Sequence, residues 1–197
     1  MSCTCPQGFP MHAYSKFDSV CADELSTPIS ADKIINQSKF CANIPKGYLL
    51  NDVEDWVTED AILLPINNKC GVYHLWYPEV MWCLEHNIWR LECAYVGKGQ
   101  GQLRAKDHLK KKYPETAHFQ MSFYACENRI AKYLEQLFLD TYKFELNSAE
   151  NDKTQGPLYA YWSEARCKYG TETARLADFE AMQEKNGRKI VRHGAQR

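Results

Sequence analysis

Long apolar segments are missing from this chain of 197 residues. The longest aliphatic run extends only from Ala61 to Ile66, whereas a helix that crosses a membrane needs roughly 20 apolar residues. The first residues also lack the basic and apolar stretches of a secretory signal peptide. We therefore expect a cytoplasmic protein that does not enter a membrane, and export by a signal-free route stays open.

The chain also carries almost no net charge, because 24 basic and 25 acidic residues give a formal value of −1. A nucleic-acid-binding domain usually has an isoelectric point above about 9, whereas the value here is about 6.6. The composition otherwise has globular proportions, with 45% hydrophobic and 25% charged residues. A nucleic-acid partner would therefore have to bind to a local basic patch.

Paired CxxC motifs are absent although the chain has nine cysteines, an odd number that would leave one unpaired in a secreted protein. Four cysteines lie in or beside apolar, strand-like runs, where a thiol behaves as a small hydrophobic side chain: Cys70, Cys83, Cys93 and Cys126. We expect them to be reduced. Four residues near the N-terminus lack the spacing of a zinc site, so we favour a structural role over zinc binding: Cys3, Cys5, His12 and Cys21.

Internal repeats and low-complexity tracts are absent as well, and the pattern of apolar residues predicts ordinary secondary structure. Aromatic and β-branched residues predict strands at residues 70–77, 92–97 and 119–123. A connection at 78–91 separates the first two strands. Helices are predicted from about Ser30 and at 103–112, 128–143 and 173–185.

One carboxylate falls on the apolar side of the strongest predicted helix, 128–143. At 100° per residue, Glu135 groups with four apolar or aromatic side chains: Ala131, Phe138, Leu139 and Tyr142. Four polar side chains form a separate arc: Lys132, Gln136, Asp140 and Lys143. An unpaired carboxylate on an apolar surface is costly. A bound cation or an arginine would neutralise Glu135, and a salt bridge at the edge of the core is the simpler alternative.

A second group of polar residues recurs on the helix predicted at 103–112. Arg104, His108 and Lys111 are spaced i, i+4, i+7 and share one face. Further basic residues lie close by: Lys106, Lys110 and Lys112. An arginine fork suits a phosphate, and a histidine suits proton transfer. A charged face exposed to solvent is the plain alternative.

Two tripeptides, Gly71-Val72-Tyr73 and Tyr95-Val96-Gly97, resemble those that name the GIY-YIG nucleases. In that family an arginine and then a histidine or tyrosine follow on a helix, and a glutamate and an asparagine come later. The matching positions are Arg104, His108, Glu135 and Asn147. The resemblance covers residues 68–147, less than half of the chain. The connection between the tripeptides is longer than is typical of the family, and Arg104 lies one residue nearer to the second tripeptide.

This resemblance implies an α+β fold, a small GIY-YIG-type domain whose three-stranded antiparallel sheet is flanked by helices. The nuclease core would comprise residues 68–147. Residues 1–67 would then be an N-terminal extension packed on the core, and residues 148–197 a C-terminal helical extension with a basic tail.

The resemblance also implies an endonuclease that hydrolyses DNA phosphodiester bonds with Mg²⁺ or Mn²⁺, of restriction or defence type. Glu135 would bind the metal, because Mg²⁺ keeps much of its water and can be held by a single carboxylate. Arg104 would stabilise the phosphate in the transition state. Asn147 would brace the site through hydrogen bonds.

The two tyrosines would divide the proton chemistry between them. We favour Tyr73 as the general base and Tyr95 as a ligand of the water or phosphate, with the reverse assignment open. His108 would assist either proton transfer or phosphate binding. Four lysines would contact the DNA: Lys98, Lys106, Lys110 and Lys111.

Other functions stay open at this stage. An interbacterial toxin DNase would use the same site and have a cognate immunity protein. A nucleic-acid-binding module without catalysis would keep the fold alone, and a purely structural protein would bind no nucleic acid. Homodimerisation is compatible with each of these functions.

Three tryptophans could stack on bases, although packing is the more common role: Trp76, Trp82 and Trp89.

Overall fold

The computed structural model describes residues 14–44, 48–50, 56–58, 63–77, 82–83, 88–111, 119–147 and 156–163. The described elements, in chain order, are α1 (Ser15–Glu24), α2 (Ala31–Ile35), β1 (Phe40–Ile44), β2 (Tyr48–Leu50), β3 (Trp56–Thr58), η2 (Leu64–Ile66), β4 (Cys70–Trp76), β5 (Trp82–Cys83), β6 (Ile88–Gln100), α4 (Gly101–Lys111), β7 (Phe119–Ala125), α5 (Asn128–Thr141) and β8 (Tyr159–Ser163). Within these ranges, no helix is both long and apolar enough to cross a membrane.

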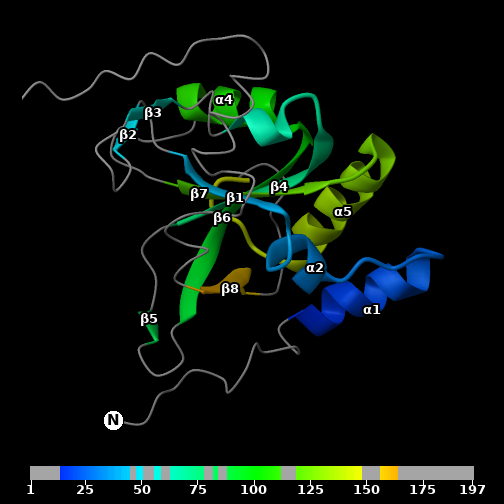
Figure 1. The fold of residues 1–197 in the computed structure, drawn as a ribbon. Helices are drawn as coiled ribbons and strands as arrows, with labels where there is room; N and C mark the ends of the chain where they lie inside the picture. Colours follow the sequence, from blue (N-terminus) through cyan, green and yellow to red (C-terminus); the bar gives the residue numbers. More distant parts are fainter. Residues whose placement is uncertain are drawn as a thin grey trace, which may run out of the picture.

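An antiparallel, curled sheet lies at the centre of an α+β fold (Figure 1). Its strands follow the order β1-β7-β4-β6, and the long strand β6 also pairs with β8 and with the two-residue β5. The three strands predicted from the sequence correspond to β4, β6 and β7. The prediction of an α+β fold with an antiparallel sheet and flanking helices is therefore confirmed.

The predicted number of three strands was wrong, because β1 and β8 extend the sheet on either side. Residues 40–44 of β1 pair with 119–123 of β7, and β8 pairs with the first residues of β6. Both added strands come from segments predicted as extensions of the core. The short sequences of β1 and β8 do not predict strands. These segments pair because β7 and β6 would otherwise leave a row of backbone N–H and C=O groups without partners.

Two further expectations differ from the structure. The predicted connection at 78–91 contains β5 and the beginning of β6. In the C-terminal extension, which was predicted to be helical, the described residues form strand β8. The helix predicted at 173–185 and the basic tail lie outside the described residues.

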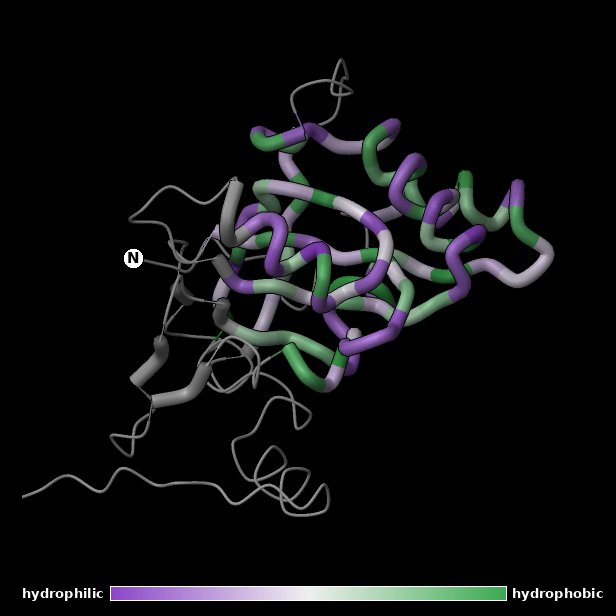
Figure 2. Tube along the Cα trace, turned by 90° about the horizontal axis from the view of Figure 1, so that it is seen from above, coloured by the Kyte–Doolittle hydropathy of each residue, from purple (hydrophilic) through white to green (hydrophobic). Residues whose placement is uncertain are grey.

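The amphipathic prediction for the strongest helix is confirmed by α5. The four apolar or aromatic residues grouped with Glu135 are all buried, and the four residues of the polar arc are all exposed. Figure 2 shows hydrophilic and hydrophobic residues alternating along the helical turns, as expected for helices that pack one face against a sheet.

The short helix α2 begins where predicted, and the Ser30 hydroxyl caps it by accepting a hydrogen bond from the Lys33 N–H at 3.3 Å.

The sheet separates two apolar clusters. On one side α5 packs against the sheet and α1 packs against α5, and on the other side α4 covers the sheet (Figure 1). Trp76 is fully buried in the α5-side cluster, where its indole N–H donates to the Ser122 hydroxyl at 2.9 Å. Trp76 is thus a core residue, and the base-stacking alternative is wrong for it. Trp89 packs partly buried against the same cluster, and the side chain of Trp82 is outside the described part.

A buried histidine lies in the middle of β4. His74 is 1% exposed, packs edge-on against the Phe138 ring at 4.7 Å between centroids, and has no hydrogen-bond partner for Nε2 among the described residues. Burial lowers the pKa of His74 from 6.5 to about 3. His74 is therefore neutral in the folded protein throughout the physiological range.

This burial predicts a loss of stability in mild acid. Below pH 6.5 the unfolded chain binds a proton at this position that the folded chain binds only near pH 3, so the free energy of unfolding falls as pH falls. Between about pH 7 and about pH 5 the contribution of His74 should amount to about 2 kcal/mol. Urea unfolding at both pH values should show this extra loss in the natural protein and not in His74→Leu. An equal pH dependence in the two proteins would mean that His74 is protonated when folded.

Candidate active site

Tyr73 and Gly97 face each other across strands β4 and β6. The antiparallel register pairs Tyr73 with Gly97, and Tyr95 lies two residues earlier on β6. A Cβ atom at Gly97 would lie 2.5 Å from the Tyr73 hydroxyl oxygen and 2.7 Å from the Tyr95 ring. Only glycine at this position therefore leaves room for both tyrosines.

The two tyrosine rings lie in the α4-side cluster, with centroids 6.0 Å apart. A register shift in the β4–β6 ladder, between Leu75 and Trp76, precedes this arrangement. Leu75 pairs with Tyr95 and Trp76 with Cys93, so one residue of β6 is unmatched. Tyr95 and Gly97 are two residues apart in unbroken register, so the alternation of side chains along β6 places Tyr95 on the same side as Tyr73.

His108 completes a chain of three proton-exchanging groups. The Tyr73 hydroxyl and His108 Nε2 are 2.6 Å apart and share a hydrogen bond, and the rings of Tyr95 and His108 lie 4.6 Å apart. The alternative of a charged face exposed to solvent is wrong for His108, because its side chain is only 6% exposed. On α4, Ala105 and His108 are three residues apart and form the buried face against the sheet.

Burial controls the acidity of both tyrosines. It raises the pKa of Tyr73 well above its ordinary value, and the charge of Tyr95 and a hydrogen bond to Tyr95 raise that pKa further. Burial also raises the pKa of Tyr95, while the hydrogen bond to Tyr73 and the charges of Arg104 and Lys98 lower it. Both hydroxyls therefore carry their protons near neutral pH, so neither tyrosine is a standing phenolate base.

Arg104, on the exposed side of α4, acts on the tyrosines through its charge. Strand β6 ends at Gln100 and α4 begins at Gly101, so the junction has no intervening loop. Gly99 has a positive φ of 125°, and a Cβ there would lie 3.2 Å from Arg104 Nε. The arginine side chain thus folds back over the end of β6. Its charge lowers the pKa of Tyr73 as well as that of Tyr95.

Glu135 forms an ion pair with Lys98, and their side chains are 17% and 33% exposed. The salt bridge considered as the simpler alternative is therefore present, with a lysine as the partner. The Lys98 ammonium bonds Oε2, and Oε1 has no hydrogen-bond partner among the residues described. The charge of Glu135 also raises the pKa of both Tyr73 and Tyr95, so the carboxylate belongs to the same electrostatic cluster.

Asn147 braces the strand that carries Tyr95. Its side-chain Oδ1 accepts from the Val96 N–H at 3.0 Å, and its Nδ2 donates to the Val96 carbonyl at 2.9 Å. The side-chain amide thus pairs with β6 as a neighbouring strand would. This geometry suits the structural role expected for Asn147, and its functional consequence stays a prediction.

The other predicted site residues are only partly described. Lys106 is half-buried on α4, whereas the side chains of Lys110 and Lys111 lie outside the described part, as does all of Lys112. Within the described ranges, no group of three or more His, Cys, Asp or Glu residues is arranged to hold a metal ion.

Cysteine placement fits a structural role. Five of the described cysteines are free thiols: Cys21, Cys41, Cys70, Cys93 and Cys126. The Cys21 sulfur accepts a hydrogen bond from the Ile29 N–H at 3.4 Å inside the core. The other candidates for a zinc site, Cys3, Cys5 and His12, lie outside the described residues.

Sequence reasoning missed two features. The pairing of Lys98 with Glu135 joins residues 37 positions apart, and Lys98 was expected to contact DNA. A pocket lined by lysines and aromatic side chains brings together α2, the segment after η2 and the end of β7. Neither arrangement has a local pattern in the sequence, because each depends on tertiary packing.

The comparisons with known proteins do not identify a family for this chain. No family model matches the chain, and neither a curated protein nor a solved structure is significantly similar to it. Inferences about function therefore depend on the residues and their geometry.

The contact at Gly97 predicts the effect of adding one methyl group. In Gly97→Ala the new Cβ would overlap the rigid, buried Tyr73 ring and separate the two tyrosines. We expect a loss of about 1–3 kcal/mol of stability, measured by urea unfolding. Gly156→Ala is the matched control, because a Cβ at Gly156 would have no atom within 4 Å. Equal stability of the two variants would contradict the close packing at Gly97.

Proposed function

We propose that the chain is an endonuclease that hydrolyses DNA phosphodiester bonds at the cluster around Tyr73 and Tyr95. The observation that carries the proposal is that five predicted site residues, far apart in the sequence, interact with one another in the fold. Tyr73, Tyr95 and His108 contact one another, and the charges of Arg104 and Glu135 act on both tyrosines. The sequence patterns alone indicate these five residues, which span 63 positions of the chain.

The resemblance to the GIY-YIG nucleases supports this proposal from the sequence side. Both tripeptides lie on adjacent antiparallel strands, and the arginine and glutamate follow on separate helices, α4 and α5. In the proposed site Arg104 contacts the scissile phosphate, because its exposed guanidinium lies over the end of β6.

A divalent cation fits the proposed site at Glu135. The carboxylate is partly accessible and has one oxygen that bonds Lys98 and one without a hydrogen-bond partner among the described residues. A single carboxylate suffices for Mg²⁺, whose remaining ligands are commonly waters and substrate oxygens. When bound, the cation would stabilise the negative charge that develops on the phosphate. Lys98 would then release Glu135 and contact the phosphate.

The burial of the tyrosines assigns their parts in the proposed proton transfer. Tyr95 is half-buried, whereas Tyr73 is only 1% exposed. We therefore place the attacking water at Tyr95, which takes a proton from water as its own proton passes to Tyr73. Tyr73 in turn passes a proton to His108 Nε2, which leaves a hydroxide and an imidazolium. Tyr73 serves as a relay in this scheme, which revises its expected role as the direct base.

A nucleic-acid-binding module without catalysis is the second candidate. The ion pair of Glu135 with Lys98 favours it, because a carboxylate neutralised by a lysine has less need of a metal. The two candidates differ in one measurement: the second binds DNA and leaves it intact with or without Mg²⁺.

Cleavage of a supercoiled plasmid should require a divalent cation and Glu135. We expect Glu135→Gln, which keeps the shape of the side chain, to lose about 10³-fold or more in rate, since a metal supplies several kcal/mol of transition-state stabilisation. Asp140→Asn is the matched control, because Asp140 is an exposed carboxylate on the same helix. Cleavage in excess EDTA, or a folded Glu135→Gln protein with full activity, would overturn the proposal.

Removal of either tyrosine hydroxyl should stop turnover without weakening DNA binding. Tyr73→Phe and Tyr95→Phe both keep the ring and its packing but break the proton path, so each should lose about 10²–10⁴-fold in rate. Tyr77→Phe is the control, because its hydroxyl bonds Glu145 at 2.6 Å, apart from the proton path. If only Tyr73→Phe is inactive, Tyr73 is the direct base, and if both variants cleave normally, the tyrosines are core residues.

A further inference from the structure

Two partly exposed cysteines lie directly opposite each other at the end of the pairing between β4 and β7. Gly71 pairs with Ala125, and the ladder continues one step further, because the Cys126 N–H donates to the Cys70 carbonyl at 3.1 Å. Opposite residues of an antiparallel pair project to the same face of the sheet. Cys70 and Cys126 are therefore neighbours in space although they are far apart in the chain.

Both side chains lie on the α5 side of the sheet. The Cys70 thiol donates to Oδ1 of Asn128, the first residue of α5, at 3.6 Å. The Cys126 side chain packs against the α5-side cluster. Each is a free thiol in the structure, so the pair is in its reduced form.

The spacing of such a pair permits a disulfide. In a hydrogen-bonded antiparallel pair the Cα atoms are about 5.5 Å apart, and disulfides bridge Cα separations of about 4.4–6.8 Å. The Cβ atoms of cross-strand neighbours are about 4.5–5.5 Å apart, whereas a disulfide prefers about 3.8 Å. Closing the bond would therefore draw the strand ends together under strain, and a strained, accessible disulfide is easily reduced again.

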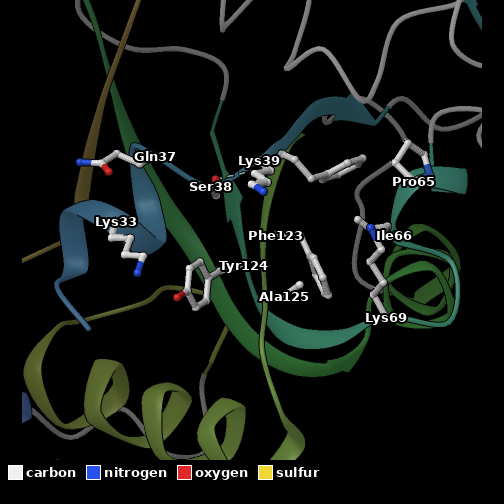
Figure 3. Close-up of a pocket in the computed structure, with 11 residues that line it drawn as sticks. Lys33, Gln37, Ser38, Lys39, Pro65, Ile66, Lys69, Phe123, Tyr124 and Ala125 are labelled. Atoms are coloured by element: carbon white, nitrogen blue, oxygen red, sulfur yellow. Dashed lines mark hydrogen bonds between the residues drawn. The ribbon is translucent and has the colours of Figure 1, made fainter. Parts of the chain in front are cut away.

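A small oxidant can reach this end of the sheet. Strand β1 pairs with β7 only as far as Phe123, and a pocket of about 400 Å³ lies beside the last residues of β7. Figure 3 shows Lys69 and Ala125 on the wall of this pocket, and each is followed in the chain by one of the two cysteines. The other described free thiols are at most 2% exposed: Cys21, Cys41 and Cys93. Oxidation should therefore favour the exposed pair over these three.

We propose that Cys70 and Cys126 form a redox-active pair that closes reversibly to a disulfide on reaction with a low-molecular-weight disulfide such as oxidised glutathione. The proposal is independent of the nuclease function, because it uses none of the five residues of the candidate active site. Closing the bond removes the hydrogen that Cys70 donates to Asn128. The pair thereby connects the thiol–disulfide balance of the surroundings to the beginning of α5, the helix that carries Glu135.

The proposed reaction consists of two thiol–disulfide exchanges. Burial raises the pKa of Cys126 to about 11, and the nearby Cys70 contributes to this rise, so Cys126 holds its proton near neutral pH and Cys70 attacks first. The Cys70 thiolate forms a mixed disulfide with one half of oxidised glutathione and releases the other half as a thiolate. The Cys126 thiolate then attacks the Cys70 sulfur and displaces the second glutathione thiolate. Two protein thiols are oxidised, one glutathione disulfide is reduced, and the released thiolates take up the two protons.

Mass spectrometry of the full chain after equilibration with glutathione tests the proposal. After incubation with equimolar reduced and oxidised glutathione, acid quenching, alkylation and tryptic digestion without reduction, we expect fragments 70–90 and 113–129 to be joined. The amount of the joined fragment should fall about tenfold or more when reduced glutathione is in large excess, because a strained disulfide is easily reduced.

Two variants assign the bond to the proposed pair. Cys126→Ala should form no link and should instead retain glutathione on Cys70, since no second thiol displaces it. Cys83→Ala is the matched control, because Cys83 belongs to the same tryptic fragment as Cys70, and it should form the link like the natural chain. The proposal is overturned if the natural chain forms no such link, if the link withstands excess reduced glutathione, if Cys83→Ala loses it, or if Cys126→Ala retains no glutathione on Cys70.

Discussion

The pairing of Tyr73 with Gly97 is the constraint on which the candidate site depends. A side chain on β6 at this point would occupy the space of the Tyr73 hydroxyl, and the chain Tyr95–Tyr73–His108 could not form. The same strand pairing fixes the start of α4, because β6 continues without a loop into that helix. The absence of a side chain at Gly97 therefore allows the positions of the Tyr95 ring, the Tyr73 hydroxyl and helix α4.

Local patterns predicted the centre of the fold and several of its site residues. The aromatic runs of β4, β6 and β7 and the amphipathic period of α5 are signals within one element, and all four elements were found. The strands β1 and β8 were missed because their pairing depends on free edges far away in the sequence. For the same reason the sequence indicated an unfavourable carboxylate at Glu135 but could not identify Lys98 as its partner.

Burial changed the interpretation of residues whose positions were predicted. His108 was predicted to assist proton transfer or phosphate binding, with an exposed charged face as the alternative, and its burial against Tyr73 is a consequence of how α4 packs on the sheet. Tyr73 was expected to touch water and is instead enclosed. Sequence patterns identify which residues share a face, whereas the exposure of that face depends on what packs against it.

The side-chain amide of Asn147 closes the outer edge of β6, together with β8 and the backbone of Leu158 and Leu146. From Ile88 to Val96 this edge offers few open backbone groups to another chain. An unprotected edge can recruit a strand from a second molecule and so extend the sheet between copies. A protein partner that approaches β6 must therefore be recognised through side chains, and the residues beside Tyr95 are protected from self-association by strand addition.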